Sequence, residues 1–176
     1  STADNHVDLG SSSSRFKDLY LSGGAYLGGT GAANKLDDYE EGTFTVTFAN
    51  TAGDMTATNL SFNASGNYVK VGELVFVRGD VSTQGTLGGS GGAAVLLTGF
   101  PFASPSSTYI KIYVDDSASY NRPSVAPTSI EIVGATTQAR VKTSTNVYQT
   151  NMPQSELGQS GNANRFYFNG VYRTTA

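Results

Sequence analysis

The stretch TFTVTF at residues 43–48 decides the fold class of this 176-residue chain. Its polar and apolar side chains alternate without a break, and successive side chains of a β-strand point to opposite faces. The stretch therefore predicts a strand that turns Phe44, Val46 and Phe48 toward a core.

Comparable patterns recur along the rest of the chain, separated by turns rich in glycine. The predicted strands cover residues 68–71, 74–81, 93–97, 109–114, 129–133, 138–142 and 165–172, and residues 60–63 are a candidate edge strand. No stretch has the periodicity of a helix. Regularly spaced short strands predict an all-β domain, an antiparallel jelly-roll-like β-sandwich over residues 37–176.

The composition excludes several kinds of chemistry. The chain has no Cys, which rules out disulfides and Cys-ligated metal, and its one histidine, His6, leaves little room for a catalytic triad. The net charge of −3 argues against binding to nucleic acid. No apolar run approaches the ~20 residues of a membrane span. We expect no cofactor, no metal and no enzymatic activity.

Residues 1–36 differ from the domain that follows. The phrase YLSGG at residues 20–24 is echoed by YLGG at residues 26–29, which predicts very short strands cut by glycines. One copy of such a segment cannot bury its own large side chains, so association with identical copies is expected. The candidate interface residues of this predicted neck are Phe16, Leu19, Leu21, Tyr26 and Leu27. The alternative is a disordered linker.

The segment DDYEEG at residues 37–42 holds four of the chain's 14 acidic residues. A site for a hard cation is one interpretation. Consecutive acids in an extended chain point to opposite faces, however, which suits cation binding poorly. We therefore favour a solvated hinge between the neck and the domain.

An aromatic stripe marks the predicted strand at residues 109–114. Alternation turns Ile110, Ile112 and Val114 inward, and the opposite set outward. The candidate ligand-binding residues are Tyr109, Lys111, Tyr113 and Asp115, joined by Tyr120 and Arg122 in the following loop. Tyrosine faces and polar groups suit sugar rings. Tyr and Arg are also enriched at subunit interfaces, which is the favoured interpretation, with a plain exposed strand as a third.

Two other patterns carry little chemistry. The glycine-rich stretches at residues 28–35 and 85–92 lack the Gly-Lys-Ser/Thr sequence of a phosphate-binding loop and predict turns. A glycosidase needs two suitably placed carboxylates. Asp115 and Asp116 are adjacent, and Glu131 and Glu156 are isolated, so the sequence selects no catalytic pair.

Several stretches resemble the C-terminal regions of tailed-phage fibres and tailspikes. Residues 8–23 look like a short repeat of these proteins, and LDDYEEGTF at residues 36–44 resembles their LDDYEEGTWTP, with Phe44 for the usual Trp and Val46 for the usual Pro. Residues 67–79 are similar to their Y-x-K-x-G-x-x-V-x-V-x-G stretch, and GFPF at residues 99–102 to their GLPF. Residues 103–164 carry no resemblance.

The resemblance implies a homotrimeric fibre or spike tip, attached through upstream fibre or virion proteins, that contacts a host surface polysaccharide or protein. The expected location is the virion, outside the cell. Alternatives are a capsid head fibre or decoration protein, a structural trimerisation domain and, less favoured, a glycan depolymerase. No helical tail of the kind found in self-cleaving fibre chaperones is predicted, so we expect either a natural end in a β-domain or a processed chain.

Overall fold

The computed structural model describes residues 6–114, 123–145, 148–159 and 161–175. The chain divides into two compact units, Ser1–Asp37 and Asp38–Ala176. No helix among the described residues is long and apolar enough to span a membrane.

The first unit contains very little regular structure. Strands β1 (Ala25–Tyr26) and β2 (Lys35–Leu36) form an antiparallel pair, with the 3₁₀ turn η1 (Ala32–Asn34) just before β2. The predicted strand at residues 20–21 is absent, since these two residues have no partner strand. None of the described residues of this unit is buried, so the unit has no core of its own.

The second unit is built almost entirely from strands. They are β3 (Tyr39–Phe44), β4 (Thr47–Asn50), β5 (Asn59–Val71), β6 (Leu74–Gln84), β7 (Val95–Thr98), β8 (Thr108–Val114), β9 (Pro127–Ile132), β10 (Gln138–Thr145), β11 (Tyr148–Asn151) and β12 (Asn162–Arg173), with the 3₁₀ turn η2 (Gln154–Glu156). The chain is 52% strand and 4% helical, which confirms the all-β prediction.

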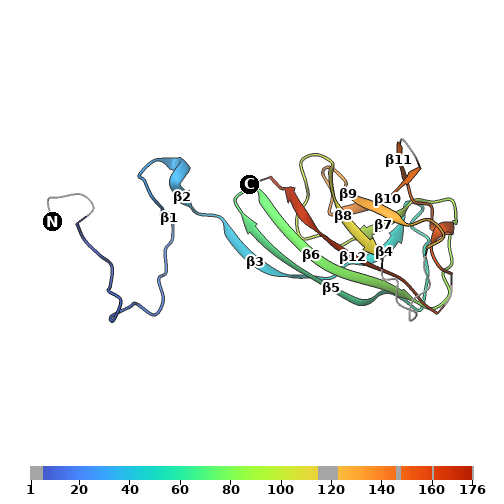
Figure 1. Cartoon of the computed structure of the whole chain (residues 1–176), viewed down its shortest axis with the longest axis horizontal. Coiled ribbons are helices and arrows are strands. Elements are labelled where there is room, and N and C mark those ends of the chain that lie inside the picture. The colour runs from blue at the N-terminus through green and yellow to red at the C-terminus, as the bar shows by residue number, and fades with distance from the viewer. Residues whose placement is uncertain (1–5, 115–122, 146–147, 160, 176) are drawn as a thin grey trace. The chain divides into compact units, whose positions relative to one another are not determined.

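These ten strands form one antiparallel sheet in the order β3-β5-β6-β12-β8-β9-β10-β7-β4, with β11 paired to β10. Figure 1 shows the long strands β5 and β6 side by side, joined by a tight turn at Gly72. The C-terminal strand β12 lies between β6 and β8. It thereby joins the first hairpin of the unit to the β8–β9–β10 meander.

The sheet curls until its two ends face each other across one core. Phe48 of β4 and Phe166 of β12 stand far apart in the strand order, yet their ring centroids are 5.2 Å apart. Register shifts in β5 and β12 accompany the curl, with Asn63 and Asn164 in left-handed backbone conformations beside them. Such bulges bend a strand and increase its twist.

The structure corrects several predicted boundaries. Residues 43–48 are not one strand, because β3 pairs with β5 and β4 pairs with β7. Residues 60–63 are the first part of β5 and not a separate strand. Residues 39–42, predicted as part of a hinge, belong to β3, where cross-strand hydrogen bonding holds them. Strand β11 has no counterpart in the predictions.

Candidate functional site

The predicted stripe lies on the outward face of β8. Tyr109, Lys111 and Tyr113 are exposed, whereas Ile110 and Ile112 between them are buried. Asp115, Tyr120 and Arg122, the other predicted ligand-binding residues, lie outside the described residues. The alternation in the sequence therefore predicted the direction of every described side chain in the stripe.

Strand β12 adds side chains to this face that the sequence did not reveal. Tyr167 is the cross-strand partner of Tyr113, and Asn169 is the partner of Lys111. Both β12 residues are exposed. Residues directly opposite each other in an antiparallel pair have Cβ atoms about 5 Å apart. Tyr113 and Tyr167 are thus neighbours on one surface.

The same face continues over β6, β5 and β3 as a polar row. Each of these neighbouring strands contributes one exposed polar residue, and each such residue is the cross-strand partner of the next. From β3 to β8 the row consists of Thr43, Asn67, Arg78, Asn169 and Lys111. With strands about 4.8 Å apart, the row spans roughly 19 Å.

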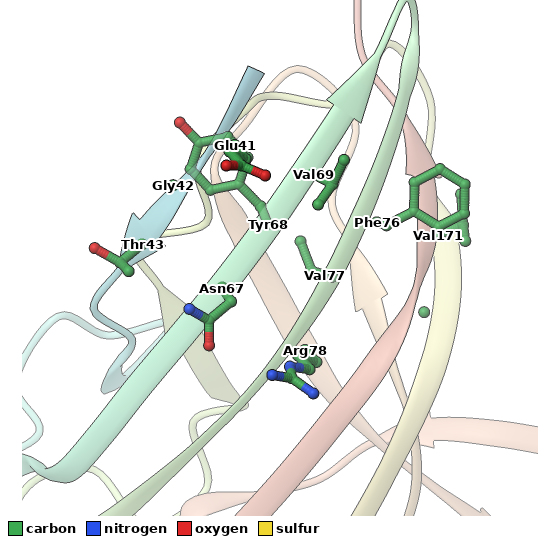
Figure 2. Close-up of a pocket in the computed structure, with 11 residues that line it drawn as sticks. Glu41, Gly42, Thr43, Asn67, Tyr68, Val69, Phe76, Val77, Arg78 and Val171 are labelled. Atoms are coloured by element: carbon green, nitrogen blue, oxygen red, sulfur yellow. The ribbon is translucent and has the colours of Figure 1, made fainter. Parts of the chain in front are cut away.

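An apolar row lies directly beside the polar row. Phe76 of β6 is in register with Val69 of β5 and Val171 of β12. Figure 2 shows these three side chains next to Asn67 and Arg78, with Thr43 on the neighbouring strand. Phe76 and Val171 are exposed. An apolar surface therefore borders one side of the polar row, and Tyr113 and Tyr167 border the other.

Two adjoining hollows make a groove along this face. The larger, of about 740 Å³, is lined by Thr43, Asn67, Phe76, Arg78 and Val171 among others. The smaller, of about 410 Å³, is lined by Asp80, Tyr167 and Asn169 and shares Asn67 and Arg78 with the first. Volumes of this order suit small ligands or short stretches of a polymer. Asn67 and Arg78 stand where the two hollows meet.

Asp80 in the smaller hollow is already neutralised. Arg165 donates two hydrogen bonds to Asp80 Oδ2, at 3.1 Å from Nε and 2.7 Å from Nη2. Ser65 Oγ donates to Asp80 Oδ1 at 2.9 Å. The Arg165 guanidinium also lies 5.0 Å from the centroid of the Tyr167 ring, within the range of a cation–π contact. This arrangement fixes the tyrosine ring at the edge of the groove.

Arg78 and Lys111 differ from the other cations that the structure describes in the second unit. Each of Lys70, Arg140, Lys142, Arg165 and Arg173 lies in an ion pair with a carboxylate. Neither Arg78 nor Lys111 has a carboxylate partner among the described residues, although the Lys111 ammonium lies 6.0 Å from the Tyr113 ring centroid. The polar row therefore carries two positive charges with which no carboxylate of the described residues pairs.

The carboxylates of residues 37–42 do not gather at one site but bind separate partners, as expected where successive side chains of an extended chain point to opposite faces. Asp37 pairs with Lys35 at 2.9 Å, and Asp38 pairs with the buried Lys70. The Tyr39 hydroxyl donates to Glu41 at 2.8 Å, which raises the pKa of Tyr39. No group of three or more His, Asp or Glu side chains gathers within the described residues.

Glu131, opposite Tyr109 on β9, is held by neighbouring strands. Its Oε2 lies 2.7 Å from Lys142 Nζ and 3.7 Å from Arg140. Burial alone would raise the pKa of Glu131, but the contact with Lys142 outweighs it, so the pKa lies below its ordinary value. Glu156 accepts a hydrogen bond from Ser124. Asp115 and Asp116 lie outside the described part of the chain, so the structure forms no catalytic pair from the described members of this set.

The predicted neck residues are all exposed within their own unit. Phe16, Leu19, Leu21, Tyr26 and Leu27 each show more than half of their surface to solvent. Val7, Leu9 and Tyr20 are at least as exposed and were not predicted as interface residues.

Together, the outward residues of β3, β5, β6, β12 and β8 make a groove with hydrogen-bonding groups between apolar and aromatic borders. In residues 74–78 and 167–171, inward and outward side chains alternate. This alternation is the sequence feature that indicates an outward direction for Phe76, Arg78, Tyr167, Asn169 and Val171. The order of the strands, which joins them into one face, was not readable from the sequence. Comparison with protein-family models, curated proteins and solved structures finds no match to this chain.

Proposed function

We propose that this chain is the C-terminal region of a virion fibre or spike of a tailed phage, and that its second unit is an adhesin that contacts a host surface glycan. Residues 1–36 act as a trimeric neck, and residues 37–176 act as the tip, a jelly-roll-like sandwich. Sequence motifs similar to phage fibre proteins and a coreless first unit with exposed apolar side chains support the proposal.

The outward face of β12 and β8 is the observation that carries the adhesin proposal. Tyr113 and Tyr167 stand side by side in register, and both are exposed. Tyrosine offers a flat apolar ring with a polar tip, which matches a sugar ring whose faces are apolar and whose rim carries hydroxyls. The amides of Asn67 and Asn169 can donate and accept hydrogen bonds with such hydroxyls. The mechanism is adhesion, and three sites on one trimer gain avidity through effective concentration.

The first test measures binding of the fluorescently labelled chain to whole host cells and to host glycans. Tyr113→Ala and Tyr167→Ala should each abolish most of the binding, because each removes one of two adjacent rings. The oligomeric mass should stay unchanged by light scattering. Tyr20→Ala, which removes an exposed tyrosine of the first unit, is the matched control and should bind like the native chain.

The outcomes separate the alternatives. Loss of the oligomer in Tyr113→Ala would identify the face as a subunit interface. Free chain that fails to block phage adsorption would favour a head fibre or decoration protein. Release of reducing sugar from host polysaccharide would identify a depolymerase.

A further inference from the structure

We propose that the polar row of Thr43, Asn67, Arg78, Asn169 and Lys111 binds an anionic polysaccharide laid across the strands, with its acidic groups at Arg78 and Lys111. This inference rests on the proposed glycan-binding function and specifies the chemistry of the ligand.

The charges of the groove favour an anionic ligand. Arg78 and Lys111 are exposed and have no carboxylate partner among the described residues. Asp80, which lines the smaller hollow, is neutralised by Arg165, whereas Glu41 at the β3 end of the larger hollow accepts from the Tyr39 hydroxyl and keeps its negative charge. The chain as a whole carries a net charge of −3. Within the described part of the second unit, the cations without a carboxylate partner are thus the two of this row.

The spacing of the two cations favours a polymer over a single small anion. Arg78 on β6 and Lys111 on β8 are separated by β12, in which Asn169 is in register with both. Two strand spacings place the two backbone positions about 10 Å apart, so the row offers positive charge at two separate points along the groove. A chain with repeating acidic groups can reach them together. The planar guanidinium of Arg78 can hold a carboxylate or sulfate with two hydrogen bonds.

The groups beside the cations favour a sugar backbone over an acidic peptide. Asn67 and Asn169 offer amides that both donate and accept, as vicinal hydroxyls require. The apolar row of Val69, Phe76 and Val171 borders the polar row on β5, β6 and β12, and the rings of Tyr113 and Tyr167 border its other side on β12 and β8. These borders can contact the C–H faces of consecutive sugar rings. An acidic segment of a second copy of the chain is the competing occupant.

The test is a binding assay of the full chain on immobilised polysaccharides. The acidic set contains alginate, hyaluronate, polygalacturonate and polysialic acid, and the neutral set contains dextran, pullulan and mannan. We expect binding to at least one acidic polymer and to none of the neutral ones. Chemical reduction of the carboxyl groups of the bound polymer should abolish binding. Raising NaCl from about 0.05 M to about 0.5 M should weaken it, because salt screens exposed charges.

Variants of Arg78 and Lys111 test whether the polysaccharide binds at the polar row. Arg78→Gln and Lys111→Gln should each weaken binding by about tenfold, which corresponds to about 1.4 kcal/mol, and Arg78→Lys should weaken it less than Arg78→Gln. Lys17→Gln, which removes the same charge from the first unit, should have no effect. All variants should keep the native oligomeric mass, and a fall in mass for Arg78→Gln would instead assign the row to contacts between copies.

The remaining results separate this inference from the function on which it rests. Equal binding to neutral polymers, binding that survives carboxyl reduction or an Arg78→Gln variant with native affinity would overturn the anionic ligand and leave the adhesin proposal standing. Absence of binding to every acidic polymer also overturns the inference. Absence of binding to whole cells as well would overturn both.

Discussion

Gly66 and Gly79 face each other across β5 and β6 beneath the aromatic part of the core. The Phe44 ring lies over Gly66, and the Phe168 ring lies over Gly79. The ring centroids of Phe44 and Phe168 are 6.1 Å apart, and Phe100 packs against both. The two glycines leave the space that lets these rings rest directly on the sheet backbone.

Gly79→Ala is expected to destabilise the second unit by about 1 to 3 kcal/mol, the usual cost of overpacking a core. A Cβ at this position would lie 2.3 Å from the Ser65 carbonyl oxygen and 2.7 Å from the Phe168 ring. Neither the strand nor the enclosed ring can move far. Chemical denaturation measures the effect, and Gly92→Ala is the control, because a Cβ there has no atom within 4 Å. Equal stability of the two variants would contradict this packing account.

These glycines show what the sequence could and could not predict at single residues. Alternation around Phe44 correctly placed its ring on the inward face. Glycine, in contrast, is equally compatible with a turn, as at Gly72, and with a strand beneath a ring, as at Gly79. The difference depends on side chains distant in the sequence, and no local pattern reports them.

At the scale of the elements, the pattern of residues 43–48 correctly predicted which side chains face the core. It wrongly predicted that these residues form one strand. Val46 and Phe48 are fully buried and Phe44 is partly buried. The chain leaves β3 at one end of the strand order and enters β4 at the other end. Because the two ends of the curled sheet face the same core, the inward side chains keep their alternation through the crossing. Period-two alternation reports burial, whereas pairing depends on the global fold.

Asp54 joins three connecting segments of the second unit. It follows β4, and its carboxylate accepts hydrogen bonds from the Ser90 hydroxyl at 2.6 Å and from Asn50 Nδ2 at 2.7 Å. Asn50 also donates to Gln154 at 2.7 Å, and Gln154 donates to the Gly88 carbonyl at 2.9 Å. The glycine-rich stretch at residues 85–92, predicted as a turn, is thereby tied to β4 and η2.

The stability of these tied segments should fall at acid pH. The hydrogen bonds from Ser90 and Asn50 lower the pKa of Asp54 from 3.8 to about 2. A carboxyl whose pKa is lower in the folded state stabilises that state fully above its unfolded pKa. Its contribution is therefore lost as the pH falls from about 4 to about 2. The protection factor of the Ser90 amide, whose N–H donates to Asp54 at 3.1 Å, should fall over this range when its hydrogen exchange is compared with the intrinsic rate at each pH.

Asp54→Asn removes the titrating group and should remove this pH dependence. The exchange of the Ser90 amide should then be faster than in the native chain at pH 6. Asp18→Asn in the first unit is the control and should leave the profile unchanged. A protection factor at Ser90 that stays constant between about pH 4 and about pH 2 in the native chain would contradict the role of Asp54.

At the scale of the whole molecule, only part of the candidate site could be predicted. The stripe at Tyr109, Lys111 and Tyr113 follows from one strand alone. Arg78 and Tyr167 join it because β12, the last strand in sequence, inserts between β6 and β8. Such pairing between distant segments depends on the packing of the entire unit. The residues that complete the groove were therefore visible in the sequence as outward side chains but not as members of one site.

The first unit leads to the prediction on assembly. None of its described residues is buried, and its large apolar side chains are exposed. Removing such surface from water contributes about 25 cal/mol per Å², which favours association with other copies. Light scattering of the native chain should give three times its mass of 18.4 kDa. The triple variant Phe16→Ser, Leu19→Ser, Leu27→Ser should give a lower mass at the same concentration.

The second unit has its own core, so the triple variant should keep the native β-rich circular dichroism spectrum and unfold cooperatively. Ser12→Ala, a small change in the same exposed unit, should leave the mass unchanged. A native chain that scatters as a monomer would overturn the trimer. A triple variant that remains trimeric would place the contacts between copies in the second unit, whose exposed hydrophobic side chains include Val71, Leu74, Phe76, Tyr109 and Tyr113.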